Sequence, residues 1–409
     1  MVSSSARRPR VLVTGSSVAG PTAAWALDRS GFDVVLLERS AVPRETGQNI
    51  DIRGLGRDVL RQLGVEEQVM ASLTGEEGTR FVNGSGRPRA VFPKVEGEDG
   101  PTAEVEILRG QLAQILVGIV PDRVDQRFGD FVVGVEQDDD GVDVTFDSGL
   151  QERFDLVIVG EGRGSRTRRL VFEDASRRRD HGVTITYGTI DRSPDDGGTW
   201  DWYTAAGGRV ASIRPDNVGT MRASLSFRSD DRDFESLPVA EQLAALRLRF
   251  GGAGWQTERI LAGFEAHPEE FYTQRMEQVI VTPWAKGRVA LVGDAAWGSG
   301  PTGMGTTLAL VGAWVLAGEL ARDLDGGVIE PAAAFRRYED LLRTYVDSAQ
   351  GLPPGGAKLL HPRSGLGASA LRAVQGVAAL KPLRSFAQKH LLTSEKGEPV
   401  LPDYPTLVH

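Results

Sequence analysis

The sequence predicts an α/β protein in which a split Rossmann-like dinucleotide-binding domain carries an inserted antiparallel β-sheet domain and is followed by a C-terminal helix. Two observations predict this fold class. Glycine-rich loops follow short apolar runs at residues 15–20, 160–164 and 293–305, so each loop is expected beside a buried strand. Between the second and third loops, residues 183–227 alternate in short segments rich in Tyr, Trp, Ser and Gly, which is typical of a separate antiparallel sheet.

The composition is that of a globular protein and excludes several classes of function. The 409 residues are 40% hydrophobic and 25% charged, and suffice for two or three domains or one enzyme core with an embedded lobe. Acidic residues outnumber basic ones by 56 to 47, which argues against nucleic-acid binding. The lack of cysteine excludes disulfides, thiolate metal sites and redox dithiols, and five scattered histidines predict no metal site.

No segment indicates export or membrane insertion. The apolar run at residues 11–13 is too short for the core of a signal peptide. The longest mostly apolar stretch, residues 308–320, contains two glycines and is shorter than a membrane span. We therefore expect a cytoplasmic monomer or homodimer with no membrane or nucleic-acid partner.

The chain opens on a βαβ unit that predicts a dinucleotide site. Residues 9–14 form a β-branched run, residues 21–30 are helix-like, and residues 34–37 form a second apolar run that ends at Glu38. A carboxylate at this position would bind the ribose hydroxyls of an adenine dinucleotide.

The loop between the first strand and the helix is the phosphate-binding candidate. Gly15 would make the tight turn and Gly20 would let the helix pack closely on the strand, while Ser17 stands where the fingerprint has its second glycine. The helix N-terminus offers unpaired N–H groups and a positive dipole to phosphates.

A second site is predicted where residues 289–292 form a strand that ends in Gly293 and Asp294. A carboxylate there lies at the carboxyl edge of the sheet, where ligands bind. The glycine-rich loop that follows leads into a helix at residues 306–323, and its backbone N–H groups could meet the edge of an electron-rich ring. The loop residues are Pro301, Gly303, Met304 and Gly305.

The rest of the pattern completes the predicted architecture. Residues 154–159 form a buried strand that breaks into a glycine-rich, basic turn containing Glu161. The polar segment 74–101 is expected to be largely loop. Further predicted elements are helices at residues 56–63, 109–120, 237–250 and 368–392, and a hairpin at residues 131–146 that turns at residues 138–141.

Together the three loops resemble the motifs of the class A flavoprotein aromatic monooxygenases, the family with the p-hydroxybenzoate hydroxylase fold. The resemblance covers residues 10–323, and the GxGxxG fingerprint, the DG motif and the GD motif come in the family's order. The spacing is most similar to tetracycline-modifying and polyketide-tailoring hydroxylases, including Arg44, residues 47–53 and Arg109.

The resemblance implies that FAD binds across a split FAD-binding Rossmann-like domain. Gly15, Gly20 and Glu38 would hold the ADP half, Arg109 the ribityl and pyrophosphate region, and Asp294 the ribityl hydroxyls. The loop from Pro301 to Gly305 would lie against the isoalloxazine, and no acid or base is assigned. Further implied cofactor contacts are Ser17, Val18, Ala19, Arg39, Arg44, Asp51, Gly303, Met304 and Gly305.

The implied domains are discontinuous. They are an FAD-binding domain at residues 1–73, 101–175 and 280–350, a β-rich substrate domain at residues 74–100 and 176–279, and a C-terminal helical segment at residues 351–409.

Three residues depart from the family pattern. Ser17 replaces Gly and Glu161 replaces Asp, and both changes are conservative enough to keep FAD binding. Trp297 stands where the family commonly has His, so it could reshape the substrate side of the cavity.

The implied activity is that of an FAD-dependent monooxygenase. NADPH or NADH, bound transiently, would reduce FAD, and O2 would add to give a flavin C4a-hydroperoxide that hydroxylates an aromatic or polyketide-type small molecule. Two alternatives stay open: a flavin-dependent reductase or desaturase of a prenyl or polyene substrate, and a non-catalytic FAD-binding protein. Candidate substrate contacts are Trp202, Arg214, Phe227 and Trp297, although alternating aromatic residues also build sheet cores.

Overall fold

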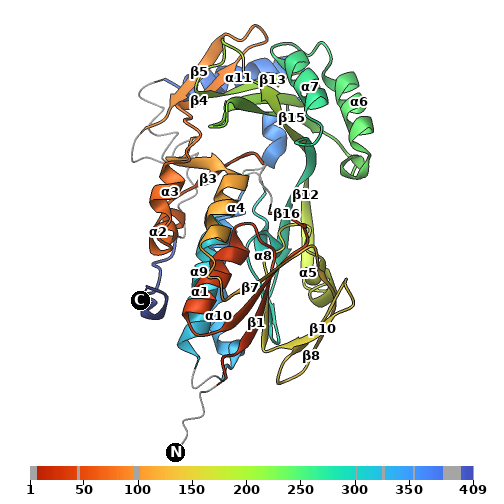
Figure 1. The fold of residues 1–409 in the computed structure, drawn as a ribbon. Coiled ribbons are helices and arrows are strands. Elements are labelled where there is room, and N and C mark those ends of the chain that lie inside the picture. The colour runs from red at the N-terminus through yellow and green to blue at the C-terminus, as the bar shows by residue number, and fades with distance from the viewer. Residues whose placement is uncertain are drawn as a thin grey trace, which may run out of the picture.

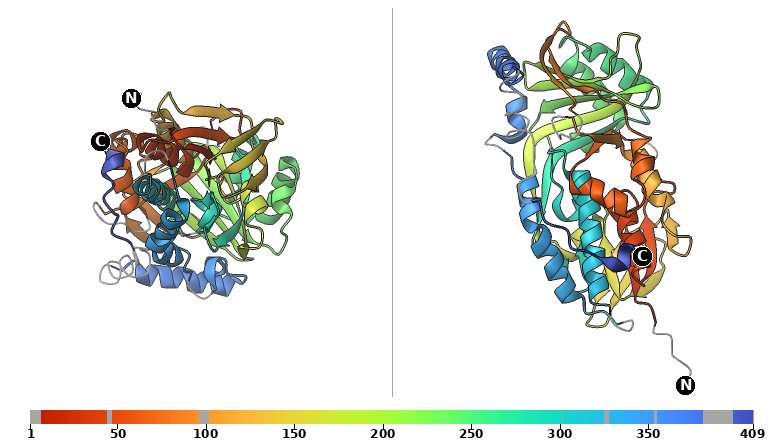
Figure 2. Two further views of the ribbon diagram at one scale, coloured as in Figure 1. Left: turned by 90° about the horizontal axis from the view of Figure 1, so that it is seen from below. Right: turned by 90° about the vertical axis from the view of Figure 1, so that its left-hand side faces the viewer.

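The computed structural model describes residues 7–43, 47–95, 102–300, 302–324, 328–352, 355–380 and 398–408. Two sheet domains are stacked end to end, and the strands β12 (Ser176–Asp191) and β16 (Tyr272–Val281) run between them (Figure 1). The molecule is elongated when it is viewed from the side (Figure 2).

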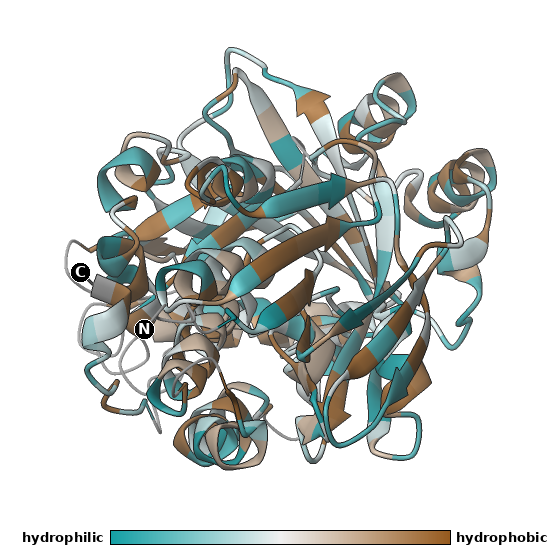
Figure 3. Ribbon diagram, turned by 60° about the horizontal axis from the view of Figure 1, so that its bottom comes forward, coloured by the Kyte–Doolittle hydropathy of each residue, from teal (hydrophilic) through white to brown (hydrophobic). Residues whose placement is uncertain are grey.

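The lower domain in Figure 1 is built on a six-stranded sheet of order β17-β18-β11-β1-β2-β7, in which only the β17–β18 pair is antiparallel. The central strands are continuous apolar runs because both faces of the sheet are covered, and all of β11 is buried. Brown, hydrophobic segments accordingly follow the central strands in Figure 3. The strands are β1 (Arg10–Thr14), β2 (Asp33–Glu38), β7 (Asp125–Phe128), β11 (Leu156–Val159), β17 (Ala285–Lys286) and β18 (Val289–Leu291).

Helices cover one face of this sheet and a small antiparallel sheet of order β10-β9-β8 lies at the other (Figure 1). Residues 307–320 of α9 are buried without a break, because α1 and α10 pack against it, so this helix has no polar stripe. The helices are α1 (Ala19–Arg29), α2 (Leu55–Gln62), α3 (Glu66–Met70), α4 (Arg109–Gly118), α5 (Arg166–Val171), α8 (Asp294–Trp297), α9 (Gly305–Arg322) and α10 (Pro331–Ala349). The smaller strands are β8 (Val132–Gln137), β9 (Val142–Phe146), β10 (Gln151–Phe154) and the antiparallel pair β3 (Asn49–Ile52) and β6 (Val105–Leu108).

The upper domain is a seven-stranded sheet of order β16-β12-β15-β14-β13-β4-β5. Helices α6 and α7 pack on its outer face, where Gly188 of β12 lets α7 approach: a Cβ on this glycine would lie 2.6 Å from the Phe264 ring. We call the opposite face, which is turned towards the lower domain, the inner face. The remaining elements of this domain are β4 (Gly78–Val82), β5 (Pro88–Pro93), β13 (Thr199–Ala205), β14 (Arg209–Pro215), β15 (Thr220–Arg228), α6 (Val239–Phe250) and α7 (Thr257–Ala266).

The β12–β16 ladder is bent where it passes from one domain to the other. Its register shifts between Asp180 and Thr184. Arg275 fills this bulge, donating to Asp180 Oδ1 and Oδ2 at 3.0 and 2.9 Å and to Thr184 Oγ1 at 3.1 Å. Because Arg275 is only 5% exposed, this paired guanidinium holds the bend in place.

The C-terminal part of the chain contacts both domains. A turn of 3-10 helix (Gly356–Leu360) leads into α11 (Gly365–Ala378), which packs on β5. The last segment, which ends in α13 (Pro405–Val408), returns to α9, where Tyr404 Oη donates to buried Glu319 at 2.8 Å.

Most elements predicted from the sequence are confirmed, including the βαβ unit, the hairpin and the helix that begins at Arg109. The polar segment 74–101 was expected to be largely loop, but it contains β4 and β5. Residues 89–93 of β5 alternate between exposed and buried, so this strand has one solvated face. Helix α11 ends at Ala378, and residues 381–392 of the predicted helix lie outside the described residues.

Among the described residues, no helix combines the length and apolar character needed to cross a bilayer.

The packing of α7 on β12 predicts a stability difference between two helical glycines. A Cβ on Gly263 would lie 2.4 Å from Ile190 Cγ2, whereas a Cβ on Gly118 at the end of α4 would meet nothing within 4 Å. We expect Gly263→Ala to lower the free energy of unfolding by about 1–3 kcal/mol through overpacking. Gly118→Ala should raise it by up to about 1 kcal/mol through helix propensity. Urea denaturation measures both, and equal effects would contradict the close packing of α7.

Candidate active site

The first glycine loop packs tightly on the second, at the carboxyl edge of the parallel sheet. Gly15 has a φ of 92°, and a Cβ there would lie 2.5 Å from the carbonyl oxygen of Gly160. A Cβ on Gly20 would lie 1.7 Å from the carbonyl oxygen of Gly15. Only glycine fits at either position, so the two loops and the start of α1 form one close-packed backbone surface.

The start of α1 leaves backbone donors free for an anion. No side chain caps this N-terminus, and Val18 and Ala19 at its beginning are buried. Arg109 Nη2 approaches Ser17 Oγ at 3.4 Å, so two residues 92 positions apart meet beside the loop. Uncapped N–H groups, a hydroxyl and a guanidinium together make a site that suits a pyrophosphate.

Glu38 lies at the end of β2, next to the same loop. Its carboxylate accepts hydrogen bonds from the backbone N–H groups of Ser16 at 2.8 Å and Ser40 at 2.9 Å. These two donors, from the segments that follow β1 and β2, fix the orientation of the carboxylate at the edge where a ribose would lie. Arg39, the next residue, is exposed.

Asp294 begins α8, directly after β18 and Gly293. Gly293 and Ala295 are both buried, but Asp294 itself is exposed. Desolvation by the surrounding protein raises the pKa of Asp294, and the charges of Arg109, Arg163 and Arg168 act in the opposite direction. An exposed carboxylate deep within the protein is available to polyol hydroxyls.

The loop before α9 lies close to β3. Gly303 has a φ of 75°, and Asp51 Oδ2 lies 3.6 Å from the position of a Cβ on this glycine. Met304 is buried, and Gly305 begins α9, whose N-terminus has no side-chain cap. Pro301 and Arg44, the other two predicted contacts of this region, lie outside the described residues.

Buried polar atoms without partners support a cofactor at this edge. Within the described residues, Ser16 Oγ, Gln48 Oε1 and Thr302 Oγ1 are buried and have no hydrogen-bond partner. Buried polar groups are normally paired, so these atoms need a polar ligand. With the uncapped helix, Glu38 and Asp294, they fit an extended dinucleotide such as FAD.

Glu161, which replaces the aspartate of the DG motif, caps α5. Its Oε2 accepts from Ser165 Oγ at 2.7 Å and from the N–H groups of Arg166 and Thr167 at 3.0 and 3.1 Å. The longer side chain therefore reaches the first turn of the next helix and fixes the second glycine loop to it.

The inner face of the upper sheet forms the opposite side of the candidate site. Trp200 and Trp202 of β13 pack together with ring centroids 4.7 Å apart, and the Arg214 guanidinium lies 3.9 Å above the Trp200 ring. Tyr187 and Tyr272 stack at 5.1 Å where β12 meets β16. Burial raises the pKa of Tyr187 to about 12, so this phenol stays neutral.

Phe227 and Trp297, two predicted substrate contacts, lie in packed cores instead. Phe227 is 0% exposed and packs edge-on against Phe234 and Phe250 under α6. Side chains alternate across a strand, so Ser226 faces inward and Phe227 faces the helices. Trp297 is 1% exposed and packs against Trp284 and Tyr338. Its ring lies against Gly312 of α9.

A buried ionic cluster joins the two domains, and no local sequence signal indicates it. Arg214 Nε donates to Glu76 Oε2 at 2.9 Å, and Arg214 Nη2 lies 2.8 Å from Glu106 Oε2. Arg214 Nη2 is also 4.0 Å from Asp51 Oδ1, and Asp51 Oδ2 accepts from Arg53 at 2.7 Å. The cluster thus links the inner face to the loop that contains Gly303.

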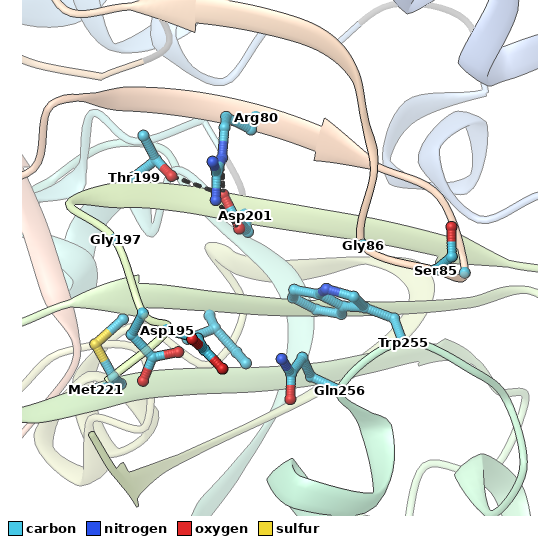
Figure 4. A pocket seen from close by; sticks show the side chains of 13 residues that line it. Arg80, Ser85, Gly86, Asp195, Gly197, Thr199, Asp201, Met221, Trp255 and Gln256 are labelled. Atoms are coloured by element: carbon cyan, nitrogen blue, oxygen red, sulfur yellow. Dashed lines mark hydrogen bonds and ion pairs between the residues drawn. The ribbon is translucent and has the colours of Figure 1, made fainter. Parts of the chain in front are cut away.

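A separate cavity of about 360 Å³ lies at the outer end of the upper sheet (Figure 4). It is lined by Asp195, Asp201, Met221, Trp255 and neighbouring residues, none of which is a predicted cofactor contact. Asp201, which is paired with Arg80, lies between Trp200 and Trp202 in the sequence of β13. Because side chains alternate along a strand, Asp201 and this cavity lie on the face opposite the two tryptophans.

The site can be compared with known proteins. A family model described as an FAD binding domain matches residues 8–346. The flavin-dependent monooxygenase eupH of Phoma sp is 33% identical, and the match covers 97% of this chain and 97% of that protein. A flavin-dependent monooxygenase of Legionella longbeachae is 38% identical over 83% of this chain and 87% of its own length.

Solved structures agree. Tetracycline destructase Tet(51) is 30% identical and superposes with a TM-score of 0.78, covering 97% of this chain and 99% of that one. Tetracycline destructase Tet(55) is 31% identical with a TM-score of 0.76 at the same coverage. Because both the family model and these relatives span most of its length, the chain belongs to the FAD binding domain family and is a flavin-dependent monooxygenase, an oxidoreductase.

Proposed function

We propose that the protein uses NADPH or NADH and O2 to hydroxylate an aromatic or polyketide-type small molecule bound at the inner face of the upper sheet. One observation carries the proposal: Asp51 lies between the Gly303 loop and Arg214, so the loop expected at the flavin ring is next to the aromatic inner face. The tetracycline destructases among the relatives make a polycyclic substrate the first class to test.

In this proposal FAD is held along the carboxyl edge of the parallel sheet. Gly15, Gly20 and the start of α1 bind the pyrophosphate with Arg109, and Glu38 binds the adenosine ribose. Asp294 binds the ribityl hydroxyls. Bound FAD, reduced by the nicotinamide cofactor, would supply the activation of O2.

The chain's own groups would orient the reactants and exclude water. Backbone N–H groups of residues 303–305, at the N-terminus of α9, would place the positive end of the helix dipole next to a bound flavin and stabilise negative charge there. Trp200, Trp202 and Tyr187 would form the apolar wall, and Arg214 would orient an oxygen of the substrate. A dry cavity is required because water would divert activated oxygen to hydrogen peroxide.

The test starts from the purified protein. It should be yellow or take up FAD, its flavin should bleach with NADPH or NADH, and the colour should return in air. Incubation with tetracyclines and other aromatic polyketides under labelled O2 should then give products that carry one labelled oxygen atom. Turnover without label would favour the reductase or desaturase, and a protein that cannot be reconstituted with FAD would rule the proposal out.

Asp294 provides a direct test of the cofactor site. Asp294→Ala removes charged hydrogen bonds to the ribityl chain, each worth about 1.5–3 kcal/mol, so FAD affinity should fall by roughly 10–100-fold. The measurement is a flavin titration of the apoprotein. Asp347→Ala, at an exposed position on α10, is the matched control and should leave the affinity unchanged.

The strand register predicts opposite effects for two aromatic residues of the upper sheet. Trp202→Leu, on the inner face, should raise KM for the substrate and change stability little. Phe227→Leu, on the outer face, should lower the free energy of unfolding by roughly 1–3 kcal/mol and leave KM unchanged. Steady-state kinetics and urea denaturation separate the two, and a raised KM in Phe227→Leu would contradict the register argument.

A further inference from the structure

Two glutamates lie side by side behind Arg214, where neither reaches water. Glu76 precedes β4 and Glu106 lies on β6, and they are 3% and 1% exposed. Both carboxylates contact the same guanidinium: Glu76 Oε2 lies 2.9 Å from Arg214 Nε, and Glu106 Oε2 lies 2.8 Å from Arg214 Nη2. Two ionised carboxylates on one guanidinium would leave a negative charge unpaired in a buried site, so a neutral arrangement requires a proton.

The hydrogen-bond donors around the two glutamates are neutral, so they do not remove the need for a bound proton. Thr102 Oγ1 donates to Glu76 Oε1 at 2.8 Å, and Thr74 Oγ1 donates to Glu106 Oε1 at 2.8 Å. Asn49 Nδ2 also donates to Glu106 Oε1, at 2.5 Å. These groups supply hydrogen bonds but no charge.

The charges that face the pair do not balance without a proton. Arg214 comes from the upper sheet, and Asp51 and Arg53 come from β3; all three side chains are at least 88% buried. Three ionised carboxylates and two guanidiniums would leave the cluster with one net negative charge in a low dielectric. One bound proton makes it neutral, and an unbalanced buried charge is strongly unfavourable.

The pKa of Glu76 agrees with this geometry. Desolvation raises the pKa of Glu76 to about 8; the charge of Arg214 acts against this rise and the charge of Glu106 adds to it. The folded pKa exceeds the ordinary value of a glutamate, so the proton is held at neutral pH and is lost as the pH rises through about 8.

We propose that Glu76 and Glu106 share one proton in the working enzyme and act as a positioning pair that holds Arg214 in a neutral cluster, where it selects an enolic or phenolic oxygen of the substrate. This inference rests on the proposed function. With the proton in place, the Arg214 guanidinium, which lies over Trp200 on the inner face, can donate to an oxygen that carries partial or full negative charge. Without the proton, the cluster repels such an oxygen.

The pair can be tested without any substrate. Infrared spectra of the FAD-loaded enzyme at pH 7 should contain the C=O stretch of a buried, protonated carboxyl, and this band should disappear with a midpoint near pH 8. In the Glu76→Gln and Glu106→Gln variants the remaining carboxylate pairs with Arg214 and ionises, so the band should be lost. Glu270→Gln is the matched control, because Glu270 also pairs with an arginine of the same sheet, and it should keep the band.

A second readout follows the selection itself. Above pH 8 the wild-type enzyme should lose affinity for 2-naphthol relative to its methyl ether, by about tenfold per pH unit. Glu76→Gln imitates the protonated form and should keep its preference across this range. Both ligands are titrated by the change in flavin absorbance.

The outcomes separate this inference from the proposed function. A wild-type enzyme without the band, or a band that persists in both glutamine variants, overturns the shared proton even if turnover is found. The selection by Arg214 is overturned if the enzyme shows no preference for 2-naphthol over its methyl ether. It is also overturned if this preference depends on pH in the same way in wild type and in Glu76→Gln. A band with the expected midpoint in an enzyme that inserts no oxygen supports the pair and contradicts the proposed function alone.

Thr102→Val tests the pair even if the glutamine variants do not fold. It removes a hydrogen-bond donor to ionised Glu76, so it should raise the midpoint pH at which the infrared band disappears.

Discussion

The close contact between the first two glycine loops is the constraint on which the rest of the structure depends. Gly15 and Gly160 lie at the ends of the adjacent parallel strands β1 and β11, and any side chain on Gly15 would collide with the backbone of the second loop. Gly20 brings α1 equally close to the first loop. Because these contacts use only backbone, the ends of the strands stay open, and the uncapped N-terminus of α1 points into the crevice where an extended cofactor can lie.

The position of the second sheet depends on one continuous ladder. The antiparallel strands β12 and β16 both extend from the lower domain to the upper one, β12 running upward and β16 downward, and their register shifts between Asp180 and Thr184. Arg275 fills that bulge with three side-chain hydrogen bonds. The inner face, with its tryptophans, tyrosines and Arg214, is thereby held opposite the cofactor edge by sheet hydrogen bonds and not by a flexible linker.

The ionic cluster around Arg214 is a buried polar contact across this interface. Its members come from β3, from β6, from β14 and from the segment before β4. The same residues therefore form the contact between the domains and part of the candidate site. Burying charge is costly unless every partner is present, and removing one member of such a pair commonly costs about 3–5 kcal/mol. A cluster of this kind makes the relative position of the two sheets specific, because a displaced sheet would leave a buried charge unpaired.

The sequence by itself determined the features that local physical chemistry controls. Turn glycines, short apolar strands and helix starts are encoded within a few residues of each other, which is why the split α/β domain, the loop at Gly15 and the position of Asp294 could all be predicted. Only the tertiary structure decided which way an aromatic or charged side chain points: Phe227 of β15 and Trp297 of α8 enter packed cores, while Trp202 and Arg214 lie on the inner face. Glu76 and Glu106 are thirty positions apart and come together only because Leu73, just before Glu76, forms a bridge with Ile107 of β6, and because Arg214 of the upper sheet contacts both carboxylates. The pairing of segments that are distant in the sequence decides which side chains meet.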